Sequence, residues 1–118
     1  MGRVDKHFKL SASQLRPLAE RMGSCVASDR ITVDGSAVGY MYREAPHNTI
    51  DSGWRFFAGD ESQEYADDPT NFSIYDVNTI ANCDPTIIPY LTSAAGCAFG
   101  RNNDGQFELE GMPGDPDA

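Results

Sequence analysis

A cysteine and a histidine are the side chains that could carry nucleophilic chemistry in this chain. Cys83 or Cys97 could act as the nucleophile with His47 as its general base, because a thiol becomes reactive when a neighbouring group helps to deprotonate it. Nothing in the spacing brings either thiol near His47, so we do not favour this interpretation. The three cysteines, Cys25, Cys83 and Cys97, form no CxxC pair and have apolar or small neighbours. This pattern indicates buried free thiols in a reducing compartment.

A string of polar residues provides the candidate pocket for a small enzyme. Its members are Arg55, Asp76, Asn78 and Asn82. Guanidinium, carboxylate and amide groups that converge on one pocket can position a substrate and move a proton. Arg55 also has a simpler interpretation, which we favour: a structural ion pair with Asp51 or Asp60.

Metal and cofactor sites are not indicated. His7 and His47 stand alone, and the acids between residues 60 and 68 lack the glycine register of a calcium loop. The glycines at 53, 59 and 96 are single, so they form no phosphate-cradling loop. We therefore expect no bound metal and no cofactor.

The segment 60–70 is the candidate binding surface. Five of its eleven residues are acids, with no base among them: Asp60, Glu61, Glu64, Asp67 and Asp68. Like charges this close repel one another, and a cationic partner would relieve the repulsion. Replacing all five by Asn or Gln is expected to leave folding intact. The five tyrosines add the aromatic content of a binding face, although most are expected at the edge of the core.

The net charge of −9 is unevenly distributed along the 118 residues. Residues 1–55 carry eight bases against six acids, whereas no Lys or Arg occurs between Arg55 and Arg101. A negative field of this kind repels nucleic acid and anionic membranes and favours a basic protein partner. The alternative is that the charge serves solubility alone.

The elements that must position these groups centre on Asp51–Phe57. Large aromatic residues between glycines predict a short strand there, with Trp54 as a core anchor. A helix of two to three turns is expected within residues 11–23, with Pro17 in its first turn. Asp34-Gly35 predicts a hairpin between strands at 31–33 and 36–44, which would pair with Asp51–Phe57.

The second half predicts another strand at 72–77, whose alternate apolar residues return to the core. Asp84-Pro85 predicts the start of a short helix over 85–91, limited by Pro89. A hairpin around Asn103-Asp104-Gly105 should place Phe107 and Leu109 on its buried face. The expected fold is α+β, with a mostly antiparallel sheet of about four to six strands, an N-terminal helix and one or two short helices.

The domain organisation follows from length and composition. We expect a flexible arm at 1–10, one α+β domain at 11–110 and a disordered Pro/Gly/Asp-rich tail at 111–118. The first ten residues have no apolar core of signal-peptide length, and no apolar run could span a bilayer. We expect the protein to be cytoplasmic.

Several motifs in one order resemble a bacterial family of predicted immunity proteins of polymorphic toxin systems, formerly catalogued as a domain of unknown function. They are VGYMYRE (38–44), DSGWRFF (51–57), GDE (59–61), NTIANCDPTIIPYL (78–91) and GCAFGR (96–101). The resemblance covers roughly residues 24–101. Cys83 departs from it, because a tyrosine or other large residue is common there in the family. No catalytic residue comes with the resemblance.

The resemblance implies a non-catalytic protein that binds a toxin and occludes its active site. The charge pattern agrees, because an acidic surface complements a basic toxin. We therefore take neutralisation of a cognate, basic toxin as the main hypothesis, with no nucleic acid and no membrane as partner. The alternatives are a small regulatory or housekeeping binding module, and the small enzyme with a pocket at Arg55, Asp76, Asn78 and Asn82.

Overall fold

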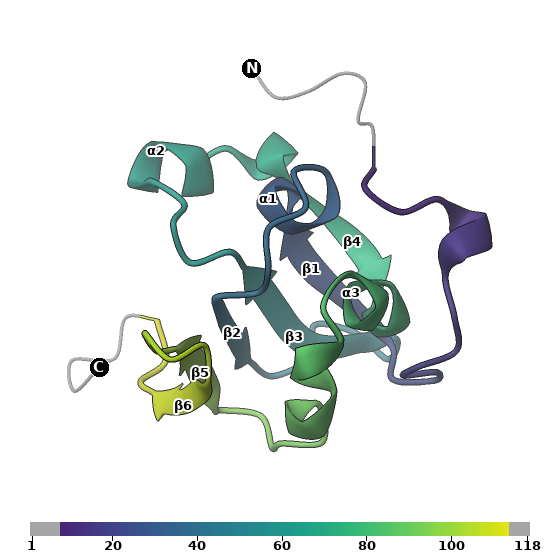
Figure 1. The fold of residues 1–118 in the computed structure, drawn as a ribbon. Helices are drawn as coiled ribbons and strands as arrows, with labels where there is room; N and C mark the ends of the chain where they lie inside the picture. The colour runs from purple at the N-terminus through teal and green to yellow at the C-terminus, as the bar shows by residue number, and fades with distance from the viewer. Residues whose placement is uncertain (1–7, 114–118) are drawn as a thin grey trace.

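A six-stranded sheet in the order β4-β1-β3-β2-β5-β6 forms the body of the protein (Figure 1). The computed structural model describes residues 8–113. The strands are β1 Ser24–Ser28, β2 Tyr40–Arg43, β3 Asp51–Phe57, β4 Phe72–Asp76, β5 Ala98–Arg101 and β6 Phe107–Glu110. The helices are α1 Asp29–Thr32, α2 Gln63–Ala66 and α3 Val77–Cys83, with 3₁₀ turns at Ala12–Gln14, Pro69–Asn71 and Pro85–Tyr90.

The pairing is mixed but mostly antiparallel. β1 lies parallel to β3, whereas β1–β4, β2–β3, β2–β5 and β5–β6 are antiparallel. The expected α+β class and strand number are confirmed, and β3 pairs with β2 as predicted. The parallel pair arises because β1 runs into α1 rather than into a hairpin.

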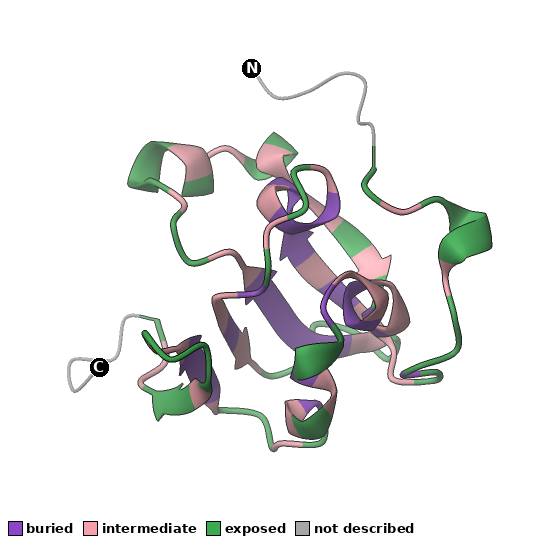
Figure 2. Ribbon diagram, viewed as in Figure 1, coloured by how far each residue is buried: buried purple, intermediate pink, exposed green. Residues whose placement is uncertain are grey.

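Helices α1 and α3 lie over the same face of the sheet (Figure 1), and the core lies between them and the strands. Trp54 and Phe56 are fully buried there, with stacked rings 5.8 Å apart. The Trp54 indole N–H donates to the carbonyl of Leu91 at 3.1 Å, which satisfies its polar group. Figure 2 shows the buried residues gathered on β1 and β3, so the predicted anchor strand is confirmed.

The N-terminal helix predicted within residues 11–23 does not form. The structure has a single 3₁₀ turn at Ala12–Gln14, followed by irregular chain. Pro17 lacks an N–H, and the free backbone groups of this segment bond to side chains of α3 instead. The Asn78 Oδ1 accepts from the N–H groups of Leu18 and Ala19, each at 2.8 Å.

The hairpin predicted at Asp34-Gly35 is also wrong. Residues 29–32 form α1, because the Ser28 hydroxyl accepts from the Arg30 N–H at 3.1 Å and caps the helix. The N–H groups of Val33 and Asp34 both donate to the Asp29 carbonyl. Gly35, with φ of +82°, therefore carries the chain out of a helix and not around a two-strand turn.

The C-terminal hairpin is confirmed as β5–β6, with one difference. Phe107 packs against Tyr90 at 5.2 Å between ring centroids, but Leu109 is 76% exposed. The layer that covers this face reaches Phe107 and ends before Leu109, which lies further along the edge strand.

The predicted arm and tail fall largely on residues 1–7 and 114–118, outside the described residues. Within the described part, the Lys9 N–H donates to the Thr32 carbonyl at 2.7 Å, and the Phe8 ring meets Tyr75 edge-on at 6.1 Å. Residues 8 and 9 therefore contact the domain.

Candidate functional site

Strand β3 carries a bulge at Gly53 that shapes the polar end of the sheet. Ser24 pairs with Asp51 and Val26 with Arg55, so two steps along β1 match four along β3. Gly53 adopts φ of +90°, and its carbonyl accepts from the Glu44 N–H at 3.0 Å. A side chain at this position would overlap the Glu44 carbonyl oxygen, so glycine is required.

The bulge brings Asp51 onto Arg55, which lies on the face opposite Trp54. The Arg55 Nη1 and Nη2 donate to Asp51 at 3.0 and 2.8 Å, and its Nε donates to Glu44 at 2.6 Å. The side chains of Arg55 and Asp51 are only 6% and 8% exposed, respectively. Hydrogen bonds from Arg55 hold the pKa of Asp51 well below its usual value, which keeps the pair charged. The predicted structural ion pair is present with Asp51, whereas Asp60 binds Arg30 at 2.6 Å.

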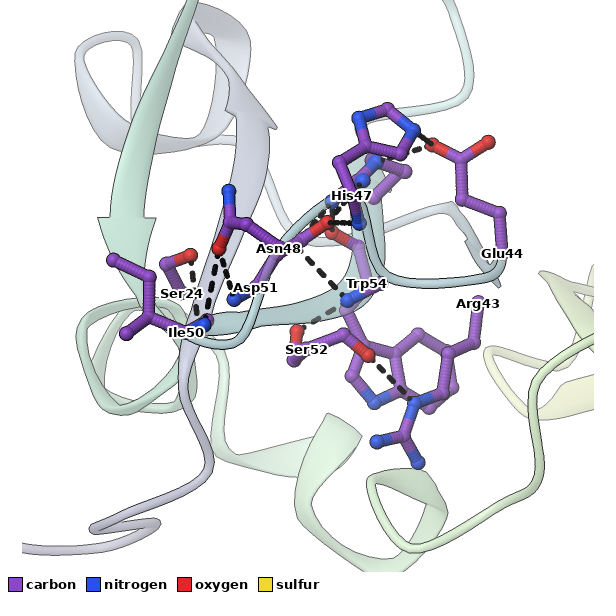
Figure 3. A network of polar contacts seen from close by, with 11 residues as sticks. Ser24, Arg43, Glu44, His47, Asn48, Ile50, Asp51, Ser52 and Trp54 are labelled. Atoms are coloured by element: carbon purple, nitrogen blue, oxygen red, sulfur yellow. Dashed lines mark hydrogen bonds and ion pairs between the residues drawn. The ribbon is translucent and has the colours of Figure 1, made fainter.

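The same aspartate orders the loop between β2 and β3 (Figure 3). Asp51 accepts from the backbone N–H groups of His47 at 2.9 Å and Gly53 at 3.0 Å. The Asn48 Oδ1 accepts from the N–H groups of Ile50 and Asp51 at 3.0 and 2.9 Å. These contacts make the polar end of β3 a rigid scaffold built around a neutralised arginine.

The four residues of the enzyme hypothesis have separate roles in the structure. Asp76 caps α3 by accepting from the Asn78 N–H at 2.9 Å. Asn78 and Asn82 donate to the Arg16 carbonyl, each at 2.8 Å, and Asn82 also donates to the Asn78 carbonyl. Arg55 lies on the other face of the sheet, so the structure does not bring these four side chains into one pocket.

The structure also does not bring the candidate nucleophile and its general base together. Cys83 and Cys97 are half-buried and pack against the core, whereas the His47 imidazole lies on the exposed β2–β3 loop, 3.5 Å from Glu44. Burial raises the pKa of the Cys25 and Cys83 thiols, which disfavours the thiolate. Among residues 8–113 there is no group of His, Cys, Asp or Glu side chains suited to a metal ion.

The five acids of the segment 60–70 differ in what they contact. Asp60 pairs with Arg30, Glu61 accepts from the N–H groups of Ala58 and Gly59, and Asp68 caps the turn at Pro69 through the Thr70 N–H. Hydrogen bonds from Arg30 and Thr70 lower the pKa of Asp60 and Asp68 respectively. Glu64 and Asp67 are exposed on and beside α2, and Asp67 accepts from Gln63 at 2.8 Å. The segment thus forms the short helix α2 with its flanking turns.

The face of the sheet opposite α1 and α3 was not predicted as a site. We call it the open face; its strand residues include Val26, Tyr40, Tyr42, Arg55, Phe57, Phe72 and Ile74. Ring contacts of 5.7–6.1 Å run from Tyr40 and Tyr42 through Phe57 to Phe72 and Tyr65. A groove of about 420 Å³ lies along the rings of Tyr42, Phe57 and Phe72 and is bordered by Ala66 and Pro69.

Ile74 shows why the open face was missed. Alternate apolar residues in 72–77 predicted a strand returning to the core, and β4 is that strand. However, Tyr75 faces the core beside Cys25, so Ile74 points to the open face and is 75% exposed. Alternation identifies a two-faced strand but does not say which face is covered.

Charge is segregated between the two faces. Among the described strand residues, Arg55 is the base that points to the open face, and its charge is balanced by Glu44 and Asp51. Arg43 and Arg101 lie on the covered face, over the rings of Trp54 and Phe107. Glu108 and Glu110 face the open side beside Gly100 and Ala98. The open face is thus aromatic, with carboxylates around it.

A small α+β domain with a partly exposed aromatic face has the features of a binding protein. The comparison with protein families specifies the class: residues 25–109 match the immunity protein Imm33 domain. The chain therefore belongs to the Imm33 family of immunity proteins. The match confirms the resemblance seen in the motifs and extends it through β6. Neither the curated proteins nor the solved structures returned a match.

No helix among residues 8–113 is long and apolar enough to cross a membrane.

Proposed function

We propose that this protein is a cytoplasmic immunity protein that binds a cognate toxin and blocks it stoichiometrically, without chemistry of its own. The observation that carries the proposal is membership of the Imm33 family. The separate structural roles of Arg55, Asp76, Asn78 and Asn82 support a non-catalytic mode, because each is already engaged by the fold.

The charge distribution supports a basic toxin. The chain carries a net charge of −9. The exposed acids Glu64 on α2 and Asp67 directly after it are close in sequence to Ala66, which lines the open-face groove. Carboxylates around a binding surface accelerate association with a cationic protein and disfavour nucleic acid. Asp60, Glu61 and Asp68 contribute to the same field while their hydrogen bonds shape the loop.

Co-expression tests the proposal. The reading frame beside this gene in its native genome would be induced in a heterologous bacterium with and without this chain. We expect the neighbour alone to stop growth, and this chain to restore growth and to co-purify with the neighbour in a stable complex. Absence of both protection and complex formation with a toxic neighbour would favour the regulatory or housekeeping alternative. Pull-down from the native host with mass spectrometry would then identify the partner.

A further inference from the structure

The open-face groove has the chemistry of a cation-binding surface. Tyr42 and Phe57 stack at 5.9 Å with an interplanar angle of 13°, and Phe72 meets Phe57 edge-on at 5.7 Å. All three rings line the groove and are partly exposed. Ile74, which is exposed, also lines the groove. Ring faces attract a guanidinium or ammonium group, and the apolar wall accommodates the methylene stem of the same side chain.

The electrostatics select the same ligand. Arg55 at the base of the groove has its charge offset by Glu44 and Asp51, and its side chain is 6% exposed. Glu64 and Asp67 are exposed within two residues of Ala66, which lines the groove, and Glu110 lies on the open face near Tyr40. A second copy of this chain would bring carboxylates against carboxylates, so it does not fit this surface.

We propose that the open-face groove is the toxin-docking surface and receives a basic side chain, an arginine or lysine, of the toxin. This inference rests on the proposed function, because it names the surface and the partner chemistry of that binding event. The toxin residue lies against Tyr42, Phe57 and Phe72, with its charge directed to the carboxylates at the rim. Such a buried basic anchor on aromatic rings is typical of interface hot spots.

A small probe tests the groove without the toxin. N-acetyl-arginine N-methylamide would be titrated into isotope-labelled protein, with the neutral isostere N-acetyl-citrulline N-methylamide as the control. We expect the arginine probe to shift the NMR signals of Tyr42, Phe57, Phe72 and Ile74, and the citrulline probe to leave them in place. Equal shifts with both probes, or shifts confined to other parts of the protein, would overturn the proposal.

Two exposed residues on opposite faces provide the variant test. Ile74 on the open face and Leu109 on the covered face are 75% and 76% exposed, so Ile74→Arg and Leu109→Arg add the same group at equally accessible positions. Both variants should keep the thermal midpoint of the parent. We expect Ile74→Arg to weaken toxin binding by roughly 30-fold or more, an effect as large as the loss of a hot-spot residue. We expect Leu109→Arg to bind the toxin like the parent.

The outcomes separate the two proposals. If the parent protein binds the toxin and Ile74→Arg binds equally well, the open face is not the docking surface, while the proposed function stands. If Leu109→Arg is the variant that loses binding, the interface lies on the covered face and the inference is overturned. If the parent does not bind the toxin, the proposed function fails, and the arginine probe still reports on the groove.

Discussion

Asp51 and Arg55 lie four residues apart on one strand, yet two hydrogen bonds of 2.8 and 3.0 Å join their side chains. On a regular strand these positions would be separated by about 13 Å. The bulge at Gly53 shortens that span, and both side chains lie on the open face. The charge of the buried arginine beneath the groove is thereby neutralised. The carboxylates around the groove therefore determine the sign of the charge on the open face.

The bulge can be tested with two glycines of similar backbone conformation. Gly53 and Gly96 have φ of +90° and +96°, but a methyl group at Gly53 would overlap the Glu44 carbonyl, whereas nothing lies within 4 Å of one at Gly96. We expect Gly96→Ala to cost about 1 kcal/mol of unfolding free energy, and Gly53→Ala to cost about 1–3 kcal/mol more. Chemical denaturation measures both. Equal losses would mean that close approach to Glu44 does not matter.

The Asp51–Arg55 pair should appear in the pH dependence of stability. Because the pKa of Asp51 is lowered in the folded state, its contribution is present above the unfolded pKa of about 4 and is lost as the pH falls toward the folded value. Asp51→Asn should cost about 1.5–3 kcal/mol at pH 7. The difference from the parent should shrink below about pH 4.

Urea unfolding at pH 7 and pH 3 measures this difference, with Asp104→Asn in the exposed turn before β6 as the control. The control should change the unfolding free energy by less than about 0.5 kcal/mol. A pH-independent difference for Asp51→Asn would contradict the assigned ion pair.

Trp54 should behave as a core anchor. Removal of its fully buried ring by Trp54→Ala should cost about 3–5 kcal/mol. The fluorescence of the folded parent should be blue-shifted and should move to longer wavelength on unfolding. Red, freely quenched emission from the folded protein would contradict the buried position.

The sequence predicted correctly those elements that are determined by residues close to one another in the chain. The aromatic run ending at Phe57 and the Asp84-Pro85 cap could be identified because each is determined by neighbouring residues. The helix predicted within 11–23 failed because Asn78 and Asn82, some sixty residues later, take its backbone hydrogen bonds. The open face was missed because its exposure depends on where α1 and α3 pack. Gly53 within a strand was the available signal for the bulge.

The structure also changes the expectation for the acidic segment. Replacing all five acids by Asn or Gln would break the ion pair between Asp60 and Arg30 and would leave one acceptor oxygen at position 61 for the two N–H groups that Glu61 binds. We expect the double variant Glu64→Gln/Asp67→Asn to keep the stability of the parent, to slow association with the toxin and to flatten the salt dependence of the on-rate. Stopped-flow kinetics at low and high salt measure this effect. An unchanged on-rate at low salt would limit these two acids to solubility.

The central claim is stoichiometric, non-catalytic neutralisation, and titration of the purified toxin's activity tests it most directly. Increasing amounts of this chain would be added to a fixed toxin concentration well above the Kd, and residual toxin activity would be measured after a constant incubation. We predict a linear fall that ends at a fixed stoichiometric equivalent, independent of incubation time. Complete loss at a small fraction of an equivalent, increasing with time, would show catalytic inactivation, and full activity in excess chain would show that no neutralisation occurs.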